Sequence, residues 1–224
     1  NALSIPQRAI IEKDGQKIEI ACDKILVAVG RRAFTKGLGL EKIGLAADKS
    51  GKVKVNKHYE TDIPGIFAVG DVIDGPMLAH KAEEEGVACA EFMAGKQGHV
   101  NYRAIPNIVY TWPEVAAIGI TEQEAEAQGI EVKIGKSTFG PNARAMCHGE
   151  TEGFVKLIAD KKTDLLLGAH IVGPNASELI AELAIAFEYS ASSEDVARSI
   201  HAHPTLAEVI KEAALAVDKR SLNG

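Results

Sequence analysis

The chain has 224 residues, 46% of them hydrophobic and 25% charged, and a formal net charge of −6 at pH 7. This length provides ample core for one large or two modest domains, and the composition is ordinary for a soluble globular protein. The negative charge and the lack of a Lys/Arg-rich block argue against a nucleic-acid partner. The most apolar stretch, residues 179–187, is interrupted by Glu182, so we also expect no membrane span.

Three cysteines, Cys22, Cys89 and Cys147, lie far apart in the sequence. An odd and scattered set indicates a reducing compartment, with neither a disulfide framework nor a thiolate metal cluster. The chain does not open with a charged-then-apolar secretory leader, and it does not begin with Met. Its first residues resemble the middle of a sheet protein, and we expect the chain to be part of a longer one.

The first hundred residues carry the pattern of an α/β fold. Two short runs separated by an Asp-Gly pair predict a β-hairpin over residues 5–20. The continuous apolar run 24–30 is typical of a strand that is buried on both faces. We also predict strands at 52–56 and 63–71, and a helix at 78–93 that ends near Gly95.

The composition becomes more polar around residues 98–107, which indicates a domain boundary. Beyond it, Thr121 and Glu124 have the spacing of a capping box for a short helix that ends near 128. Further strands are predicted at 108–111, 130–139, 153–160 and 165–172, and helices at 176–188 and 205–219. This part therefore resembles an α+β domain with an antiparallel sheet and helices on one side.

Asp71 stands at the end of the predicted strand 63–71. Ligands of doubly wound sheets bind beyond the carboxyl ends of the strands, where an Asp can accept a hydrogen bond from a ribityl hydroxyl. The alternative is an Asp that only caps the following turn. The next helix opens near His80, and its free backbone N–H groups suit an anion or a polarised carbonyl. His80 itself is expected to cap or pack, because a helix start disfavours its protonated form.

Gly30 ends the first predicted buried strand and is followed by two arginines. A glycine permits the close approach of a cofactor, and arginines suit phosphate groups. A solvated loop with a turn glycine explains the same segment equally well. The chain contains no G-x-G-x-x-G, so the pyrophosphate fingerprint of a dinucleotide-binding domain is absent.

A segment near the C-terminal end contains His201, His203 and Glu208. A His with a carboxylate partner is a candidate proton shuttle, but Thr205-x-x-Glu208 is also the pattern of a helix capping box. Pro204 restricts the preceding residue to an extended conformation, and a His-Pro bond is a candidate for the cis form. A zinc site would need more ligands than the sequence offers at a recognisable spacing. Glu208 could therefore face either the helix N-terminus or an imidazole ring.

Six stretches of the chain together resemble the dihydrolipoamide dehydrogenase branch of the pyridine nucleotide–disulfide oxidoreductase family. Each stretch is a weak signal alone, but all six occur in the family's order and cover nearly the whole chain. Gly-Pro-Met-Leu-Ala-His at 75–80 is similar to the lipoamide branch and differs from the glutathione and mercuric reductases. The six stretches are 29–32, 61–71, 75–86, 110–115, 168–174 and 201–208.

The resemblance implies an α/β remnant of the nucleotide-binding domains followed by an α+β dimerisation domain with an antiparallel sheet and flanking helices. Residues 1–31 would end the NAD-binding domain, 32–103 would form a central segment that contacts FAD, and 104–224 would form the dimerisation domain. The implied cofactors are FAD and NAD. The implied partners are a second copy in a homodimer and the lipoyl domain of a 2-oxoacid dehydrogenase or glycine cleavage complex. The location would be cytoplasmic, or the mitochondrial matrix in a eukaryote.

The resemblance also implies roles for individual residues. Gly30 would lie against NAD, and Asp71 would bind the ribityl chain of the flavin. Four residues would run beside the isoalloxazine ring: Met77, Leu78, Ala79 and His80. His203 would be the general base that takes a proton from a dihydrolipoyl thiol for the partner subunit's flavin, with Glu208 orienting the ring and stabilising the imidazolium. We therefore predict that Glu208 turns to the ring of His203 and that His201 is a packed neighbour. The thiolate would then exchange with an enzyme disulfide, from which electrons pass to FAD and a hydride to NAD.

The chain departs from this family mainly in what it lacks. The N-terminal FAD fingerprint, the C-x-x-x-x-C redox disulfide and the NAD-domain glycine motif are all missing, and Trp112 replaces the His of some relatives. We therefore expect these residues alone to be inactive and to lack most of the surface that holds FAD. Two other interpretations remain open: another branch of the family acting on a different disulfide substrate, or a non-catalytic dimerisation module.

Overall fold

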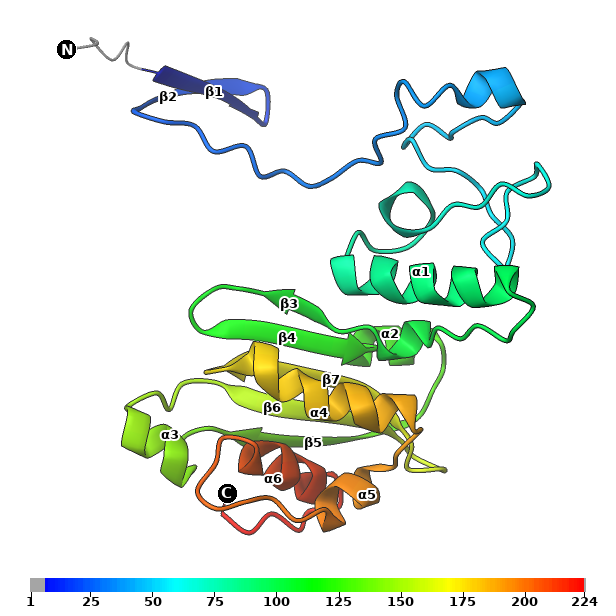
Figure 1. Ribbon diagram of the computed structural model, residues 1–224. Helices are drawn as coiled ribbons and strands as arrows, with labels where there is room; N and C mark the ends of the chain where they lie inside the picture. Colours follow the sequence, from blue (N-terminus) through cyan, green and yellow to red (C-terminus); the bar gives the residue numbers. More distant parts are fainter. Residues whose placement is uncertain (1–6, 224) are drawn as a thin grey trace. The chain divides into compact units, whose positions relative to one another are not determined.

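The computed structural model describes residues 7–223 (Figure 1). Contacts between residues separate the chain into two compact units, one up to Cys89 and one from Ala90 onward. No helix within the described range is both long and apolar enough to cross a bilayer.

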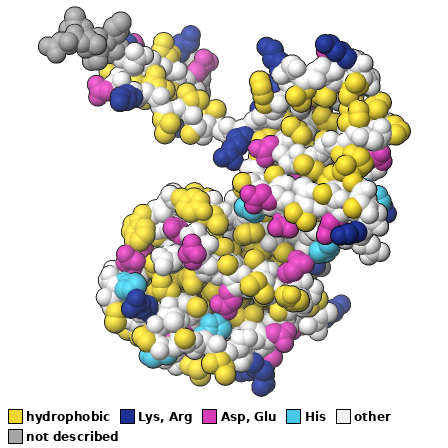
Figure 2. Space-filling model, in the orientation of Figure 1, with side chains coloured by type: hydrophobic (Ala, Val, Ile, Leu, Met, Phe, Trp, Pro, Cys, Tyr) yellow, Lys and Arg dark blue, Asp and Glu magenta, His cyan; other side chains and the backbone are white. Residues whose placement is uncertain are grey.

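The first unit begins with an antiparallel hairpin of β1 (Gln7–Lys13) and β2 (Gln16–Cys22). Asp14 and Gly15 connect the strands with φ angles of 55° and 75°, the left-handed conformation that a two-residue hairpin turn requires. The predicted hairpin is confirmed. Apolar side chains of both strands remain exposed: Ile10, Ile11, Ile18 and Ile20. Figure 2 shows hydrophobic side chains on the surface of this part of the chain.

Three strands predicted in this unit do not form, and those predictions were wrong. Residues 24–30 are irregular, and Leu26 and Val29 are 91% and 93% exposed. Residues 52–56 and 63–71 contain only isolated bridges, between Ala47 and Val53 and between Glu60 and Phe67. An apolar run indicates burial, but a strand buried on both faces needs neighbouring strands to pair its backbone. The described part of the unit supplies no such neighbours.

Two short 3-10 helices, η1 (Leu40–Ile43) and η2 (Gly70–Val72), precede the long helix α1 (Ala79–Met93). The helical pattern over 78–93 is thereby confirmed. Gly95 follows with a φ of 73°, and its N–H donates to the carbonyl oxygen of Phe92, as expected of a glycine that ends a helix. The division between the two units falls within α1.

The second unit is built on an antiparallel sheet with the strand order β3-β4-β7-β6-β5. Four of the strands overlap predicted ones, and the fifth, β4, lies in a segment that the sequence left unassigned. The strands are β3 (Asn107–Val109), β4 (Glu114–Gly119), β5 (Val132–Thr138), β6 (Phe154–Asp160) and β7 (Leu166–Gly173).

Helices cover one face of this sheet (Figure 1). α4 (Ala176–Glu188) packs on β4 and β7, α6 (Glu208–Val217) packs on β5 and β6, and α5 (Ser193–Arg198) packs on α6. Alternate residues of the strands and one face of each long helix form a single core, which includes Val155, Leu157, Ala169, Ile171, Ile180, Leu183 and Ile210. The α+β arrangement with helices to one side is as predicted, and α4 has the predicted bounds.

The shorter helices were predicted less well. α2 (Glu122–Ala127) begins with the expected capping box, in which Thr121 and Glu124 each bind the other's backbone N–H. α3 (Ala143–His148) and α5 were not predicted, because six residues show little periodicity. The helix predicted from residue 205 begins only at Glu208.

Candidate functional site

His203 lies between α5 and α6, and its ring contacts the first residue of α6, Glu208. Nδ1 of the ring is 3.0 Å from one carboxylate oxygen, Oε1, and 3.2 Å from the other. The His203 side chain is 69% exposed and that of Glu208 is 25% exposed. The peptide bond from His203 to Pro204 is cis. An imidazole is thus presented at the surface with a carboxylate behind it.

The carboxylate of Glu208 contacts both groups that the sequence offered as its partner, the ring of His203 and the backbone at the helix start. Its Oε2 accepts the N–H of Thr205 at 2.9 Å while the same group contacts the His203 ring. Thr205 Oγ1 donates to the carbonyl oxygen of Ala202 at 2.8 Å, so only half of a capping box is present. Burial raises the pKa of Glu208, but the hydrogen bonds from Thr205 and His203 outweigh it and hold that pKa below its ordinary value.

An ionised carboxylate only accepts hydrogen bonds, so a neutral His203 ring must carry its proton on Nδ1. That tautomer leaves a lone pair on Nε2, and no residue between 7 and 223 hydrogen-bonds to this nitrogen. Glu208 therefore both fixes the tautomer and faces the positive charge that appears when Nε2 takes up a proton. The arrangement has the chemistry of a general base.

Asn142 is a further residue of this site, and the sequence did not single it out. Its side chain is buried, and its Oδ1 accepts the N–H of Ala145 at the start of α3. Its Nδ2 donates to the carbonyl oxygen of Thr205 at 2.9 Å, which ties α3 to the segment that carries the imidazole. A cavity of about 120 Å³ lies beside His203, with Asn142, Glu208 and Glu212 among its lining residues.

The residues predicted to contact cofactors lie in the first unit. Asp71, in η2, is exposed, and the four residues at the start of α1 are partly buried or exposed: Met77, Leu78, Ala79 and His80. Arg31 Nη1 donates to the carbonyl oxygen of Met77 at 2.9 Å, which joins the Gly30 loop to the start of α1. Gly30 has a φ of 114° and open space where a side chain would stand. The loop that follows Gly30 is thus held to the residues that precede α1.

A buried ion pair holds the turn that carries Asp71. Lys81 Nζ lies 3.1 Å from Glu85 Oε1, and both side chains are fully buried. Glu85 Oε2 accepts the N–H of Gly70 at 2.7 Å, and Lys81 Nζ donates to the carbonyl oxygen of Gly70 at 3.3 Å. Both members of the pair thus bind the backbone of one residue. The i, i+4 spacing was visible in the sequence, but it is equally typical of exposed pairs.

The first unit fits one side of a flavin site. Asp71 offers an exposed carboxylate to a hydroxyl group, and the first turn of α1 contains no acidic residue that would compete with a negatively charged ligand. Gly75 brings the backbone close to the helix, because an added Cβ would stand 2.9 Å from Lys81 Cε. The fit is partial, since the chain lacks a glycine-rich pyrophosphate motif.

Two family models match the chain. The model for the dimerisation domain of pyridine nucleotide-disulphide oxidoreductases matches residues 105–214, and the model for pyridine nucleotide-disulphide oxidoreductases matches residues 5–86. The chain belongs to the pyridine nucleotide-disulfide oxidoreductase family. The His203–Glu208 pair lies within the first match, and the Asp71 turn lies within the second.

Similar members of the family are dihydrolipoyl dehydrogenases. The chain is 54% identical to mitochondrial dihydrolipoyl dehydrogenase 2 of Arabidopsis thaliana over 90% of this chain and 40% of that protein. It is 53% identical to dihydrolipoyl dehydrogenase of Trypanosoma brucei brucei over 93% of this chain and 44% of that protein. Leghemoglobin reductase of Glycine max is 54% identical over 90% of this chain and 39% of that protein. The chain thus spans less than half the length of these relatives.

Solved structures of the family share the fold. LpdA of Mycobacterium tuberculosis has a TM-score of 0.82 and 29% sequence identity, over 90% of this chain and 44% of that chain. The HOCl-induced flavoprotein disulfide reductase RclA of Escherichia coli has a TM-score of 0.84 at 22% identity, over 94% of this chain and 48% of that chain. The antiparallel sheet with flanking helices is therefore the fold of the family's dimerisation domain.

Proposed function

We propose that this chain is the C-terminal part of a dihydrolipoamide dehydrogenase, which oxidises protein-bound dihydrolipoamide with NAD through FAD and a redox disulfide. The observation that carries the proposal is the imidazole–carboxylate pair of His203 and Glu208 in a chain that is more than half identical to dihydrolipoyl dehydrogenases. The redox disulfide and the main FAD motif are not in these residues. We expect the chain by itself to be inactive.

His203 is the proposed general base. The lone pair on Nε2 takes the proton of a dihydrolipoyl thiol, which becomes a thiolate. Glu208 keeps the proton of the neutral ring on Nδ1 and stabilises the imidazolium that forms, because its carboxylate lies 3.0 Å away. The exposed position of the ring suits a thiol on a long arm that approaches from outside the domain.

The proposed cofactor residues act by position and charge. Asp71 would accept a hydrogen bond from a ribityl hydroxyl, and residues Met77 to His80, at and just before the start of α1, would run beside the flavin ring, where the positive helix end would favour negative charge. Gly30 provides close approach for NAD. FAD, when bound, supplies a two-electron acceptor between the redox disulfide and NAD.

The remaining parts of the proposal concern assembly. We propose a homodimer formed through a dimerisation domain at 104–224, preceded by a central segment at 32–103 and the end of an NAD-binding domain at 1–31. Exposed apolar side chains on the hairpin and at 24–30 support contact with further domains, because such surfaces are usually covered. The lipoyl domain of a 2-oxoacid dehydrogenase or glycine cleavage complex is the proposed partner. The proposed location is the cytoplasm or, in a eukaryote, the mitochondrial matrix.

The test uses the full-length flavoenzyme and the variant His203→Gln, with His99→Gln as the matched control. His99 also faces a glutamate, Glu188 at 3.1 Å, but it lies outside the candidate site. We expect His203→Gln to lower kcat for dihydrolipoamide at least about 100-fold, because general-base catalysis contributes that much. His99→Gln should leave kcat unchanged. Near-normal turnover by His203→Gln would refute the proposed base.

A second candidate function is the reduction of another acceptor by the same fold. Leghemoglobin reductase is as similar to this chain as the dihydrolipoyl dehydrogenases are, and this similarity favours it as the alternative. Comparing kcat/KM for dihydrolipoamide oxidation with that for reduction of a haem protein by the same full-length enzyme separates the two. A higher value for the haem protein would support the alternative.

A further inference from the structure

His201, two residues before the candidate base, is buried and bonded at both ring nitrogens. Its side chain is only 6% exposed. Nδ1 lies 3.1 Å from the carbonyl oxygen of Ser199, and Nε2 lies 2.7 Å from Oε1 of Glu182 in α4. The sequence predicted a packed neighbour, and the structure adds a specific carboxylate partner from a different helix.

Both partners of the His201 ring are acceptors. A backbone carbonyl and an ionised carboxylate have no proton to donate, whereas a neutral imidazole has a single N–H. Only the protonated ring, with two N–H groups, satisfies both contacts. Burial of an imidazolium is costly unless an opposite charge is near, and Glu182 provides that charge.

Three charged groups face the His201 ring. Glu182 approaches from α4, and Glu208 and Lys211 approach from α6. The hydrogen bond to Glu182 raises the pKa of His201 above its ordinary value, against the opposing effects of burial and of Lys211. The raised pKa of His201 agrees with the hydrogen-bond geometry, which requires a protonated ring.

The segment that carries His203 is fastened on both sides of that residue. Before it, the carbonyl oxygen of Ser199 accepts a hydrogen bond from Lys211 Nζ at 2.6 Å and another from the His201 ring. After it, Thr205 is held by Asn142 and by Glu208. The contact to α4 is made by the His201–Glu182 pair, so this pair determines where the start of the segment lies relative to the long helices.

We propose that His201, as an imidazolium paired with Glu182, is a positioning residue that fixes the segment from which His203 reaches the substrate thiol. This inference rests on the proposed function of His203. Without the charge of Glu182, the ring loses its second proton, and the charge-assisted contact between the segment and α4 becomes a weaker neutral hydrogen bond. The segment, and with it the base, is then held less firmly.

The test compares two isosteric variants on α4 in the full-length flavoenzyme. Glu182→Gln removes the charge that faces the buried His201, and Glu188→Gln removes the charge that faces His99, whose side chain is 72% exposed. We expect Glu182→Gln to lower kcat about tenfold with KM within about twofold, because small displacements of a reacting group reduce turnover strongly. Glu188→Gln should change neither value.

The second measurement is the ¹⁵N spectrum of histidine-labelled full-length enzyme, with His201 assigned through His201→Gln. We expect both ring nitrogens of His201 to carry protons at neutral pH in the unmodified enzyme and in Glu188→Gln, and only one in Glu182→Gln. A neutral His201 ring in the unmodified enzyme would overturn the inference even if Glu182→Gln failed to fold. Equal kcat in the two Gln variants would also overturn it. Full turnover by His203→Gln would overturn the proposed function itself, whatever the spectrum shows.

Discussion

Lys81 and Glu85, one turn apart on α1, are both inaccessible to solvent and together bind the amide and the carbonyl of Gly70. Removing one charge leaves the other buried without a partner, which is far more costly than removing both. This asymmetry makes the pair a sensitive probe of the turn that carries Asp71.

We expect Lys81→Met to lower the free energy of unfolding of the full-length protein by about 3–5 kcal/mol, because Glu85 then keeps a buried uncompensated charge. The double variant Lys81→Met/Glu85→Leu should recover most of this loss. Urea denaturation measures both effects, and faster hydrogen exchange of the Gly70 amide should accompany the single variant. Lys52→Met is the control, since the partner of Lys52, Asp74, is almost fully exposed. Equal midpoints for Lys81→Met and Lys52→Met would contradict this account.

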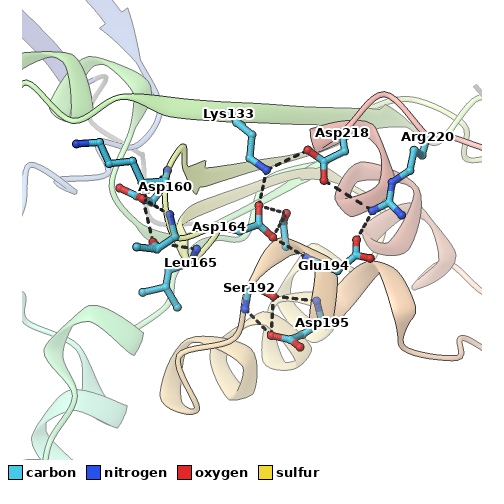
Figure 3. A network of polar contacts seen from close by, with 12 residues as sticks. Lys133, Asp160, Asp164, Leu165, Ser192, Glu194, Asp195, Asp218 and Arg220 are labelled. Atoms are coloured by element: carbon cyan, nitrogen blue, oxygen red, sulfur yellow. Dashed lines mark hydrogen bonds and ion pairs between the residues drawn. The ribbon is translucent and has the colours of Figure 1, made fainter.

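Asp164 is the centre of a polar network in the second unit (Figure 3). Its carboxylate forms an ion pair with Lys133 Nζ at 2.6 Å and accepts a hydrogen bond from Ser193 Oγ at 2.8 Å. Lys133 also forms an ion pair with Asp218. Arg220 joins Asp218 to Glu194. The network therefore ties β5, the turn between β6 and β7, the start of α5 and the end of α6 together.

Asp164→Asn should destabilise the protein at neutral pH by about 2 kcal/mol, the contribution of hydrogen bonds to a charged group. Burial raises the pKa of Asp164, but its hydrogen bonds with Lys133, Glu194 and Ser193 outweigh it and leave that pKa lowered. Because the pKa of Asp164 is lower in the folded protein than in the unfolded chain, its charge stabilises the fold at any pH above the pKa of the unfolded chain. This stabilisation is lost as the pH falls through the pKa of the folded protein. The difference in the free energy of unfolding between the unmodified protein and Asp164→Asn should therefore disappear at acid pH. Asn also tolerates the φ of 63° at this position, so the change isolates the charge.

Thermal unfolding of both proteins across a pH series measures this gap, with Asp74→Asn as an exposed control. A gap that persists unchanged at the lowest pH would show that geometry, and not charge, is the source of the effect.

Gly168 lies in β7 between two paired strands, where a side chain has no room. An added Cβ would stand 1.9 Å from the carbonyl oxygen of Ile120, a backbone atom that cannot move without the sheet. We expect Gly168→Ala to cost about 3 kcal/mol or more, since overpacking here forces the backbone apart. Gly140→Ala is the control, because its nearest neighbour would be Thr138 Oγ1 at 3.6 Å. The soluble yield and the denaturation midpoint of each variant measure the effect, and equal values would refute the predicted clash.

Glu212, one turn after Glu208 on α6, binds the chain near its C-terminal end. Its carboxylate accepts the N–H of Leu222 at 2.8 Å and contacts Asn223 through backbone and side chain. We expect Glu212→Leu to accelerate hydrogen exchange at the amides of Leu222 and Asn223, with the amides of β7 as an internal reference. Unchanged exchange at these two residues would show that other contacts hold the segment.

The sequence predicted the second unit well because its signals are local. α4 has an apolar stripe over thirteen residues, and the capping box at Thr121 and Glu124 marks the start of α2 without ambiguity. The strand predictions at 24–30 and 63–71 failed for the opposite reason. An apolar run predicts burial, but a buried strand also needs neighbouring strands to pair with, and the described residues supply none, so Leu26 and Val29 remain exposed.

The candidate site shows the same limit. His203 and Glu208 are five residues apart, and this spacing left two partners open for Glu208, the ring of His203 and the backbone at Thr205; the structure shows both contacts. Glu182 lies nineteen residues before His201 on another helix, and only the packing of α4 brings the two together. The burial of Lys81 and Glu85 was equally invisible, since the same spacing occurs on exposed helix faces.

Among the described residues, the contacts that orient His203 and its segment all lie within the second unit. In the proposed function, the proton acceptor would therefore be preorganised before a substrate arrives, and the free energy of substrate binding would not be spent on assembling it. A dihydrolipoyl arm would then meet a base that is already oriented, and ordering the arm itself would be the remaining entropic cost.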